Sequence, residues 1–354
     1  MMFASPRRLR AAVVGLGQVG SRFDEDPGRK VAWSHVGAYL ALADRFELVV
    51  AAEILPANVE AFSRRCPGTP VVGDPAALAD FAPDVVSICT PAVSHGAILH
   101  TVLNCPSIKA VWCEKPMAED LAEAEAMVAG CRERGIAMLV SFNRHWLPLW
   151  LRLREIVAGG SLGTVRSVRV SMPNRLFSIG SHAVDLALTF GGPVEAVRVL
   201  ELPALAETGE PAVSALVRYQ SGASGLIQVT GFKSRLIVEV EVIGDDGRVL
   251  AREDRGTITI ETFRDSPFFC GYRQLADARV ETLRSATDFS AFVAMAEEIH
   301  AAVTTDAPLS CDGTHALAVQ RMLALMASPT VISTRIWSDR QCDAHNVPSC
   351  RSGG

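Results

Sequence analysis

Two side chains of this sequence suit the handling of an alcohol proton, those of Lys115 and His182. Lys115 follows an apolar run and precedes Pro116, whose ring stiffens the chain after it. An ammonium held at the end of a strand stabilises negative charge on an oxygen, such as an alkoxide that forms as hydride leaves. A lysine beside a glutamate, here Glu114, is also the composition of an ordinary surface ion pair. These residues alone leave both interpretations open.

His182 lies in a stretch that predicts a helix over 179–190, ended by two glycines and a proline. On such a helix Ser178 and Asp185 share the face of His182, four residues before it and three after it. A histidine titrates near neutral pH and can accept the proton of a secondary alcohol. The competing interpretation is a core histidine that hydrogen-bonds to Asp185.

The first apolar run of the chain leads into the pattern Gly15-x-Gly17-x-x-Gly20, with Gln18 and Val19 between the last two glycines. The first glycine permits a tight turn, the second lets a pyrophosphate approach the backbone, and the third lets helix and strand pack closely. Free N–H groups and the dipole of the following helix favour a diphosphate there. The pattern also arises by chance in glycine-rich chains, so the neighbouring sequence must indicate whether it binds a dinucleotide.

That context is the next strand, over 46–52, which ends in Glu53. An acidic side chain at this place accepts both hydroxyls of the adenosine ribose and repels a 2′-phosphate, so it favours NAD over NADP. Glu53 lies farther from the glycines than the roughly 20 residues that the fingerprint expects. The excess, 23–34, predicts a loop inserted after the first helical turns. It is either a solvated surface loop or a flap over the nicotinamide or the substrate.

Ligands of an open α/β sheet lie beyond the carboxyl ends of its strands, so the other strand ends are the places to search. One strand ends at Thr90 and Pro91, with His95 a helical turn further on. Another ends at Glu114 and Lys115. The last ends just before Asn143 and Arg144. All of these side chains are expected to face the cofactor cleft.

Strands and helices alternate through residue 142, which predicts a parallel, doubly wound sheet with right-handed crossovers. The pattern then changes to β-branched runs joined by turn signals, with one helix among them and closing helices over 289–304 and 314–327. The sequence therefore predicts an α/β Rossmann domain followed by an α+β domain with an open, mostly antiparallel sheet. We expect the domains to span 1–143 and 144–337, followed by a polar tail, 338–354, whose composition is compatible with disorder.

The composition of the 354 residues is that of an ordinary globular protein, with 49% hydrophobic and 21% charged residues. A net charge of −5 gives no reason to expect a nucleic acid or an anionic membrane as partner. The nine cysteines form no C-x-x-C pair, so we expect buried thiols in a reducing cytoplasm and no metal ion. Arg7-Arg8 imitates a twin-arginine signal, but cleavage there would remove the glycine turn.

Taken in order, the motifs resemble the glucose–fructose oxidoreductase/inositol dehydrogenase (Gfo/Idh/MocA) family. They are the glycine turn, Ser87-Ile88-Cys89-Thr90-Pro91 with His95, Cys113-Glu114-Lys115-Pro116, and Gly180-x-His182-x-x-Asp185-Leu186. The resemblance covers about residues 10–327. It implies that Lys115 holds the substrate hydroxyl, that His182 is the base, and that Arg144 touches substrate or nicotinamide ribose. It also implies a homodimer or homotetramer formed through the open sheet.

One position departs from the family pattern. Many members carry an aspartate four residues before the histidine, where this chain has Ser178. Serine cannot raise the basicity of His182 as a carboxylate does. Either Asp185 takes over that role, or Lys115 carries more of the proton chemistry, or activity is weak.

The candidate residues fall into three sets. The catalytic pair is Lys115 and His182, and the supporting residues are Asp185, Ser178, Arg144 and His35. The cofactor set is Gly15, Gly17, Gln18, Val19, Gly20, Glu53, Thr90, Pro91, His95, Glu114, Lys115 and Asn143. Specificity is expected on the open sheet and on loops near Arg175, Tyr272 and Arg273.

The sequence favours an NAD-dependent dehydrogenase that oxidises a secondary hydroxyl of a sugar, cyclitol, amino sugar or aminoglycoside to a ketone. One alternative is a ketoreductase acting on a nucleotide-linked or antibiotic sugar. The other is a regulator that senses the dinucleotide without catalysis.

Overall fold

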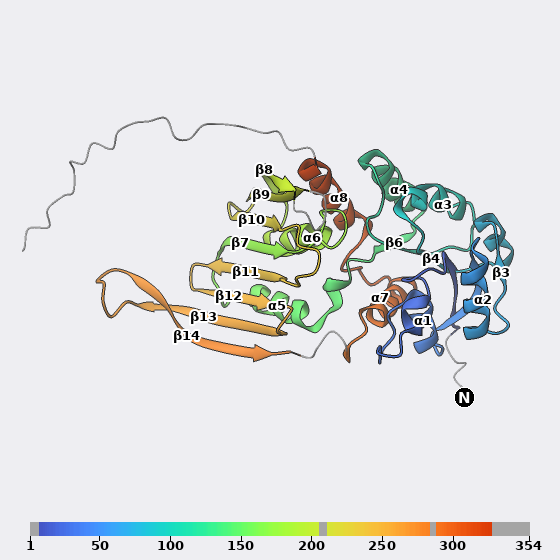
Figure 1. The fold of residues 1–354 in the computed structure, drawn as a ribbon, viewed down its shortest axis with the longest axis horizontal. Helices are drawn as coiled ribbons and strands as arrows, with labels where there is room; N and C mark the ends of the chain where they lie inside the picture. The colour runs from blue at the N-terminus through green and yellow to red at the C-terminus, as the bar shows by residue number, and fades with distance from the viewer. Residues whose placement is uncertain (1–6, 205–210, 284–287, 328–354) are drawn as a thin grey trace, which may run out of the picture.

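The computed structural model describes residues 7–204, 211–283 and 288–327, and it contains two β-sheets that lie side by side (Figure 1). The strands of the first sheet lie within 9–140, and those of the second lie within 165–204 and 211–282. The predicted tail, 338–354, lies outside the described residues. The predicted combination of a Rossmann domain and an α+β domain is confirmed.

The first sheet has six parallel strands in the order β3-β2-β1-β4-β5-β6. They are β1 (Leu9–Val14), β2 (Phe46–Ala52), β3 (Val71–Val72), β4 (Val85–Ile88), β5 (Ala110–Cys113) and β6 (Ala137–Val140). β1 and β4 are buried along most of their lengths, as expected for strands covered on both faces. The strand order reverses between β1 and β4, so the cleft at their carboxyl ends is the expected ligand site.

Helices connect these strands, as expected for a doubly wound sheet. They are α1 (His35–Ala41), α2 (Pro56–Arg65), α3 (His95–Val102) and α4 (Leu121–Glu133), with the 3-10 helices η1 (Arg22–Glu25), η2 (Pro75–Phe81) and η3 (Ala92–Ser94). Asp120 caps α4 by accepting a hydrogen bond of 2.8 Å from the Glu123 N–H. Asp74 caps η2 by accepting a hydrogen bond of 2.9 Å from the Ala76 N–H.

The second sheet has eight strands in the order β14-β13-β12-β11-β7-β10-β9-β8, and only the β7–β10 pair is parallel. They are β7 (Val165–Met172), β8 (Val194–Ala204), β9 (Pro211–Tyr219), β10 (Ser224–Val229), β11 (Glu239–Gly244), β12 (Gly247–Arg252), β13 (Thr257–Asp265) and β14 (Arg273–Thr282). The sequence did not predict β12 and β14. Helices α5 (Pro148–Ala158) and α6 (Ser181–Gly191) cover one face of this sheet (Figure 1).

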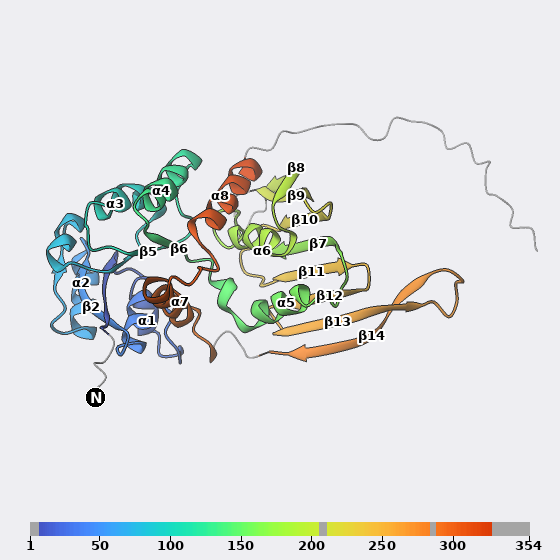
Figure 2. The same cartoon turned by 180° about the vertical axis from the view of Figure 1, so that it is seen from behind.

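The last two helices connect the two sheets. α7 (Ala291–Thr305) packs against α1 and against β5 and β6, although it lies in the range predicted for the second domain. α8 (Gly313–Ala327) contacts both α4 and α6, and thus stands between the two halves of the molecule (Figure 2). None of the helices in the described ranges combines the length and the apolar character that crossing a membrane requires.

Candidate active site

The glycine turn has the shape that a dinucleotide needs. Gly15 has φ +88°, a left-handed conformation that favours glycine, and a side chain there would also press on Thr90. A side chain at Gly20 would overlap the Gly15 carbonyl oxygen. At Gly17 a Cβ would meet nothing within 4 Å, so the space beside its backbone is open. These are the separate functions predicted for the three glycines.

The helix that follows the turn is interrupted by the predicted insertion. The Ser21 N–H donates to the Gly17 carbonyl at 3.0 Å and closes one helical turn. The chain then leaves the helix axis and returns at α1, where the His35 N–H donates to Val19 and the Val36 N–H donates to Gly20. α1 therefore continues the first turn, and 23–34 is a loop inserted into one helix, as predicted.

Asp24 anchors this loop. Its carboxylate accepts hydrogen bonds from the Trp33 N–H and the Ser34 hydroxyl, and from the Arg65 guanidinium at 2.7 Å. The side chain of Asp24 is only 11% exposed, so water competes little for its carboxylate oxygens. Ser290, just before α7, donates to the Ala32 carbonyl. Hydrogen bonds thus tie the loop to α2 and to the residue before α7. A freely solvated surface loop would lack such bonds.

Glu53 lies at the end of β2, as predicted, and its carboxylate is held by the backbone. It accepts hydrogen bonds from the N–H groups of Leu16, Ile54 and Leu55 at 2.7–2.9 Å and from the Asn58 amide at 3.0 Å. Burial by itself raises the pKa of Glu53, but these hydrogen bonds lower it overall. The side chain is therefore an anion with fixed orientation, the property that would repel a 2′-phosphate.

A cavity of about 570 Å³ opens beside Glu53 at the carboxyl ends of β1, β2 and β4. Its lining includes Gly15, Gly17, Glu53, Thr90 and Pro91, all predicted to contact the cofactor. The volume is within the range of about 300–1,000 Å³ that is usual for ligand pockets. These residues therefore fit the adenosine half of NAD.

Lys115 follows β5 and reaches the second domain. Its Nζ atom donates to the Ser178 carbonyl at 3.2 Å, and its peptide bond to Pro116 is cis. Burial lowers the pKa of Lys115 from 10.5, while the nearby Glu114 carboxylate raises it and Arg144 lowers it further. The ammonium is thus held at the boundary between the two sheets, in contact with the segment that leads into α6.

His182 lies in the first turn of α6, and its ring packs edge-on against Phe142 at the end of β6. Burial lowers the pKa of His182 well below 6.5, and the charges of Arg144, Lys115 and His145 lower it further. Its Nδ1 atom is buried without a hydrogen-bond partner among the described residues. The Lys115 charge is thus one of those that lower the pKa of His182, and the lowered pKa favours a neutral imidazole.

The structure contradicts the predicted place of Ser178 on the helix and the bond between Asp185 and His182. α6 begins at Ser181, so Ser178 precedes the helix and does not share a face with His182. Asp185 does not bond to His182 either, since its Oδ1 atom lies 2.6 Å from His145 Nε2 and 2.8 Å from His315 Nε2. Asp185 thus does not replace the missing aspartate, and the core-histidine interpretation with an Asp185 bond is also wrong.

His35 is buried next to Glu114 and does not line the cleft. Its side chain is fully buried, and Nε2 lies 3.1 Å from Glu114 Oε1. The ring also lies against Trp112, with ring centroids 3.8 Å apart. Burial lowers the pKa of His35 in spite of this carboxylate, so a neutral ring holds Glu114 beside Lys115. His35 can therefore affect the cleft only through Glu114.

The remaining strand ends are also ordered by specific bonds. Arg144, in the 3-10 helix η4 (Asn143–Trp146), forms two bonds of 2.8 Å with the Glu253 carboxylate. Its neighbour Asn143 has a buried Oδ1 atom without a partner among the described residues, an acceptor suited to a ligand amide or hydroxyl. His95 is buried and lies 2.7 Å from the Thr90 carbonyl oxygen and 3.1 Å from that of Met117.

Sequence reasoning missed Glu253 and misplaced two specificity residues. Glu253 follows β12, a strand that was not predicted, and no local motif marks it. Tyr272 and Arg273 lie at the turn of the β13–β14 hairpin, which projects away from the first sheet (Figure 1). Tyr272 is 70% exposed there. These two residues are therefore not beside the cleft of their own chain.

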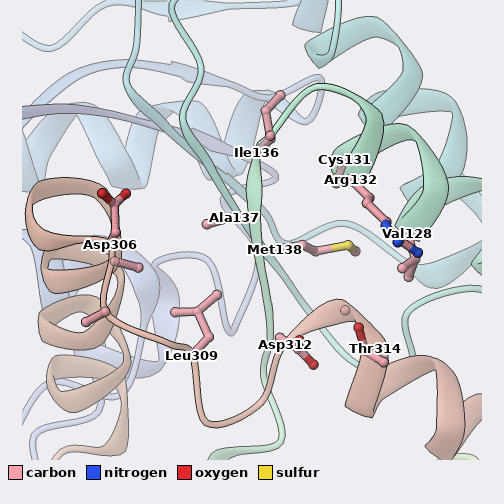
Figure 3. A pocket seen from close by; sticks show the side chains of 14 residues that line it. Val128, Cys131, Arg132, Ile136, Ala137, Met138, Asp306, Leu309, Asp312 and Thr314 are labelled. Carbon is pink, nitrogen blue, oxygen red and sulfur yellow. The ribbon is translucent and has the colours of Figure 1, made fainter.

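A second groove, of about 480 Å³, lies between α4, the start of β6 and the connection from α7 to α8 (Figure 3). Its lining includes Val128, Arg132, Met138 and Asp306. It opens at the amino end of β6, whereas ligands of such a sheet bind at the carboxyl ends. It is therefore not the cofactor site.

Residues 9–142 match the model of the Gfo/Idh/MocA family, an oxidoreductase family with an NAD-binding Rossmann fold. With the motifs and the geometry above, this match identifies residues 9–142 as an NAD-binding Rossmann domain of that family.

Individual relatives agree with this. The chain is 24% identical to myo-inositol 2-dehydrogenase of Thermotoga maritima over 281 residues, which are 72% of this chain and 78% of the relative. It is 30% identical to D-glucoside 3-dehydrogenase of Escherichia coli over 207 residues, 53% of this chain and 54% of the relative. The chain thus spans only about half the length of some of the relatives that it matches.

Among solved structures, a levoglucosan dehydrogenase in complex with NADH superposes with a TM-score of 0.74. The superposition covers 91% of this chain and 96% of that chain, at 18% identity. At this identity the likeness shows the fold alone, and it extends over both sheets.

Proposed function

We propose that the chain is an NAD-dependent dehydrogenase that oxidises a secondary hydroxyl of a sugar, cyclitol, amino sugar or aminoglycoside to a ketone in the cytoplasm. The observation that carries the proposal is the position of Lys115 and His182. They come from different domains, and the Lys115 ammonium donates to the Ser178 carbonyl at 3.2 Å, four residues before His182. The named inositol and glucoside dehydrogenases among the relatives support this substrate class.

The residues that would hold NAD are those that line the cavity and the strand ends. The glycine turn would receive the pyrophosphate, Glu53 the adenosine ribose, and Asn143 with its free acceptor the nicotinamide half. When bound, NAD supplies the acceptor of the substrate's hydride. In the proposal the substrate hydroxyl binds beside Lys115, at the boundary between the two sheets.

The proton chemistry follows from the charges at the site. In the proposal the Lys115 ammonium donates a hydrogen bond to the substrate hydroxyl and stabilises the oxygen as negative charge develops on it. His182 then accepts the hydroxyl proton, for which its ring must be neutral, and its lowered pKa ensures this. A lowered pKa also makes His182 a weak base. Lys115 must therefore contribute more to catalysis than it would beside an Asp–His pair.

Other candidates position these two groups. Glu114, held by His35, keeps a negative charge beside Lys115 and limits the fall of its pKa. Arg144 is fixed by Glu253, so its role is to hold the substrate side of the cleft while keeping His182 neutral. Ser178 contributes its backbone carbonyl, which orients the ammonium, and not its hydroxyl.

The experiment is a panel of sugars, cyclitols and aminoglycosides with NAD, with turnover measured as NADH absorbance. Lys115→Ala and His182→Ala should each lower kcat by at least about 100-fold, the size of a lost acid–base or electrostatic contribution, and leave NAD affinity unchanged. Lys109→Ala is the matched control, since Lys109 is an exposed lysine just before the same strand β5. His100→Ala, an exposed histidine on α3, is the second control.

Three outcomes would contradict the proposal. Full activity of both active-site variants on a confirmed substrate would refute the assigned roles. NAD binding without turnover on any member of the panel would favour the dinucleotide-sensing alternative. Turnover only in the direction of ketone reduction, with a nucleotide-linked or antibiotic sugar, would favour the ketoreductase.

We also propose that the open sheet joins two copies of the chain. The face not covered by α5 and α6 carries Leu216, which lies directly across from Leu226 on β10 and Arg198 on β8. Leu216 is 61% exposed, and Val280 and Leu200 on this sheet are 60% exposed. Exposed apolar side chains on a sheet face support a role as an interface.

A further inference from the structure

Four side chains of types that can bind a metal ion form a cluster at α6, and the proposed function gives none of them a role. His145, Asp185, Cys311 and His315 each offer one ligand atom, and all four atoms lie within 4.8 Å of one another. The first three side chains are buried, and His315 is half-buried. We propose that this cluster binds a divalent transition-metal ion, with Zn²⁺ as the best fit, in a closed structural site.

The ligands come from four separate parts of the fold. His145 lies in η4, Asp185 in α6, and His315 in the first turn of α8. Cys311 is fixed because its carbonyl accepts from the Val140 N–H at 3.1 Å, and its neighbour Asp312 pairs with Leu139 of β6. Figure 3 shows this connection running past β6 to the start of α8. The cysteine spacings gave no sign of this site because only one cysteine takes part.

The donor set suits zinc in type and charge. Imidazole, thiolate and carboxylate all bind zinc, and two imidazoles, one thiolate and one carboxylate supply the four ligands of a tetrahedral site. Two neutral histidines with two anions neutralise a divalent cation. Softer metals that favour sulfur alone, and Mg²⁺ or Ca²⁺ that favour oxygen alone, match this set less well.

A second observation points to a missing partner at the same place. Asp185 has no exposed surface, and while its Oδ1 atom receives both histidines, its Oδ2 atom has no hydrogen-bond partner in the described part of the chain. Leaving a buried carboxylate oxygen unpaired is costly, of the order of 1–3 kcal/mol or more. A cation among the four ligands would satisfy it.

Metal binding would lengthen the contacts to Asp185 and would displace the side chains of Arg154 and Thr189 from His145. Ligand atoms at about 2.0–2.3 Å around a tetrahedral ion lie roughly 3.3–3.8 Å apart, so the contacts of 2.6 and 2.8 Å to Asp185 must lengthen. Arg154 also lies 3.1 Å from His145 Nδ1, as a donor. A His145 ring bound to metal through Nε2 keeps its proton on Nδ1, so the guanidinium must swing away. Thr189, 3.3 Å from His145 Nε2, must also release that atom.

The test uses the full chain and does not depend on its activity. Protein purified without chelators is analysed for bound metal, stripped, and titrated with Zn²⁺ and Co²⁺. We expect about one ion per chain, a thiolate-to-cobalt charge-transfer band, and a rise in Tm on Zn²⁺ binding. Cys311→Ser should abolish the charge-transfer band, and His315→Gln should weaken affinity by about 100-fold or more. Cys105→Ser, at a buried cysteine outside the cluster, is the control and should change neither.

The variant Arg154→Ala distinguishes a metal site from a cluster that is held by hydrogen bonds alone. If a metal binds, removing the competing donor to His145 should tighten Zn²⁺ binding by about 10-fold, the size of effect that outer partners of a ligand have. The proposal is overturned if the wild type binds neither ion at micromolar concentrations, or if Cys311→Ser keeps the cobalt spectrum. In either case His145, Asp185 and His315 are a hydrogen-bonded network without metal.

Discussion

At the scale of single residues, the site depends on two basic groups whose protonation is set by burial. Burial favours the neutral form of both His182 and Lys115, so the pKa of each lies below its usual value. For His182 this is useful, because a base must be unprotonated. For Lys115 it narrows the pH range in which the ammonium is present, and Glu114 opposes that effect.

The pH dependence of kcat/KM follows from these directions. The acid limb, where His182 gains a proton, should lie below pH 6.5, and the alkaline limb, where Lys115 loses one, should lie below pH 10.5. Glu114→Gln removes the charge that raises the Lys115 pKa, so the alkaline limb should move to lower pH while the acid limb stays. Steady-state rates over the pH range measure both limbs.

The control for this profile is Glu119→Gln, at an exposed carboxylate on the same connection. An acid limb at or above pH 6.5 would mean that His182 is not the buried neutral base described here. An alkaline limb unmoved by Glu114→Gln would remove Lys115 from the proton chemistry.

The residues with local signals were predictable, and those without them were not. Gly15, Glu53 and Lys115 stand at strand ends, and a parallel sheet brings its carboxyl ends to one edge. The partners of Asp185 could not be predicted, because His145 and His315 are 170 positions apart and meet only when α8 returns to α6. The same holds for Glu253, which bonds to Arg144 although the two residues are 109 positions apart.

At the scale of elements, the inserted loop shows how a known fold accommodates extra sequence. The loop leaves the helix after one turn and returns to the same axis, so the strand–turn–helix unit is preserved. Asp24 replaces the helical bonds that the insertion interrupts, with partners on the loop itself and on α2.

Asp24→Ala should therefore destabilise the protein. Loss of the bonds to Ser34 and Arg65, in a setting that is 11% exposed, should lower the free energy of unfolding by about 1–3 kcal/mol. Denaturant unfolding followed by tryptophan fluorescence measures the change. Asp26→Ala is the matched control on the same loop, where the carboxylate is 58% exposed, and it should change stability by less than about 0.5 kcal/mol. Equal effects of the two substitutions would show that Asp24 does not anchor the loop.

The elements that the sequence missed are those without an apolar pattern. β14 is mostly exposed along its length, so it lacks the alternation that marks a half-buried strand. β12 has only a short apolar run, 249–251, between Arg248 and Arg252, which was too short to mark a strand. Both are placed by hydrogen bonds to neighbouring strands, which become visible only in three dimensions.

At the scale of the whole molecule, the two domains are joined by more than the chain between them. α7 returns to the first sheet, α8 packs on both halves, and Lys115 reaches the segment before α6. These contacts fix the distance between the lysine of one domain and the histidine of the other. The open face of the second sheet takes no part in this and remains free for a second copy.

A change on that face should therefore alter assembly without altering the fold. We expect the wild type to be a dimer or tetramer, and Leu216→Glu to shift it toward the monomer by placing a charge in the middle of the proposed interface. Size-exclusion chromatography with light scattering measures the mass. Arg218→Glu, two residues along the same face and near the edge of the sheet, gives a comparison. A monomeric wild type would contradict the proposed interface.

The central claim is that one substrate hydroxyl meets both Lys115 and His182 beside the nicotinamide. A crystal structure with NAD and a substrate from the panel tests it directly. We predict a hydroxyl oxygen within hydrogen-bond distance of Lys115 Nζ and of the His182 ring, with its carbon facing nicotinamide C4. A dinucleotide or a substrate bound away from both side chains would contradict the account.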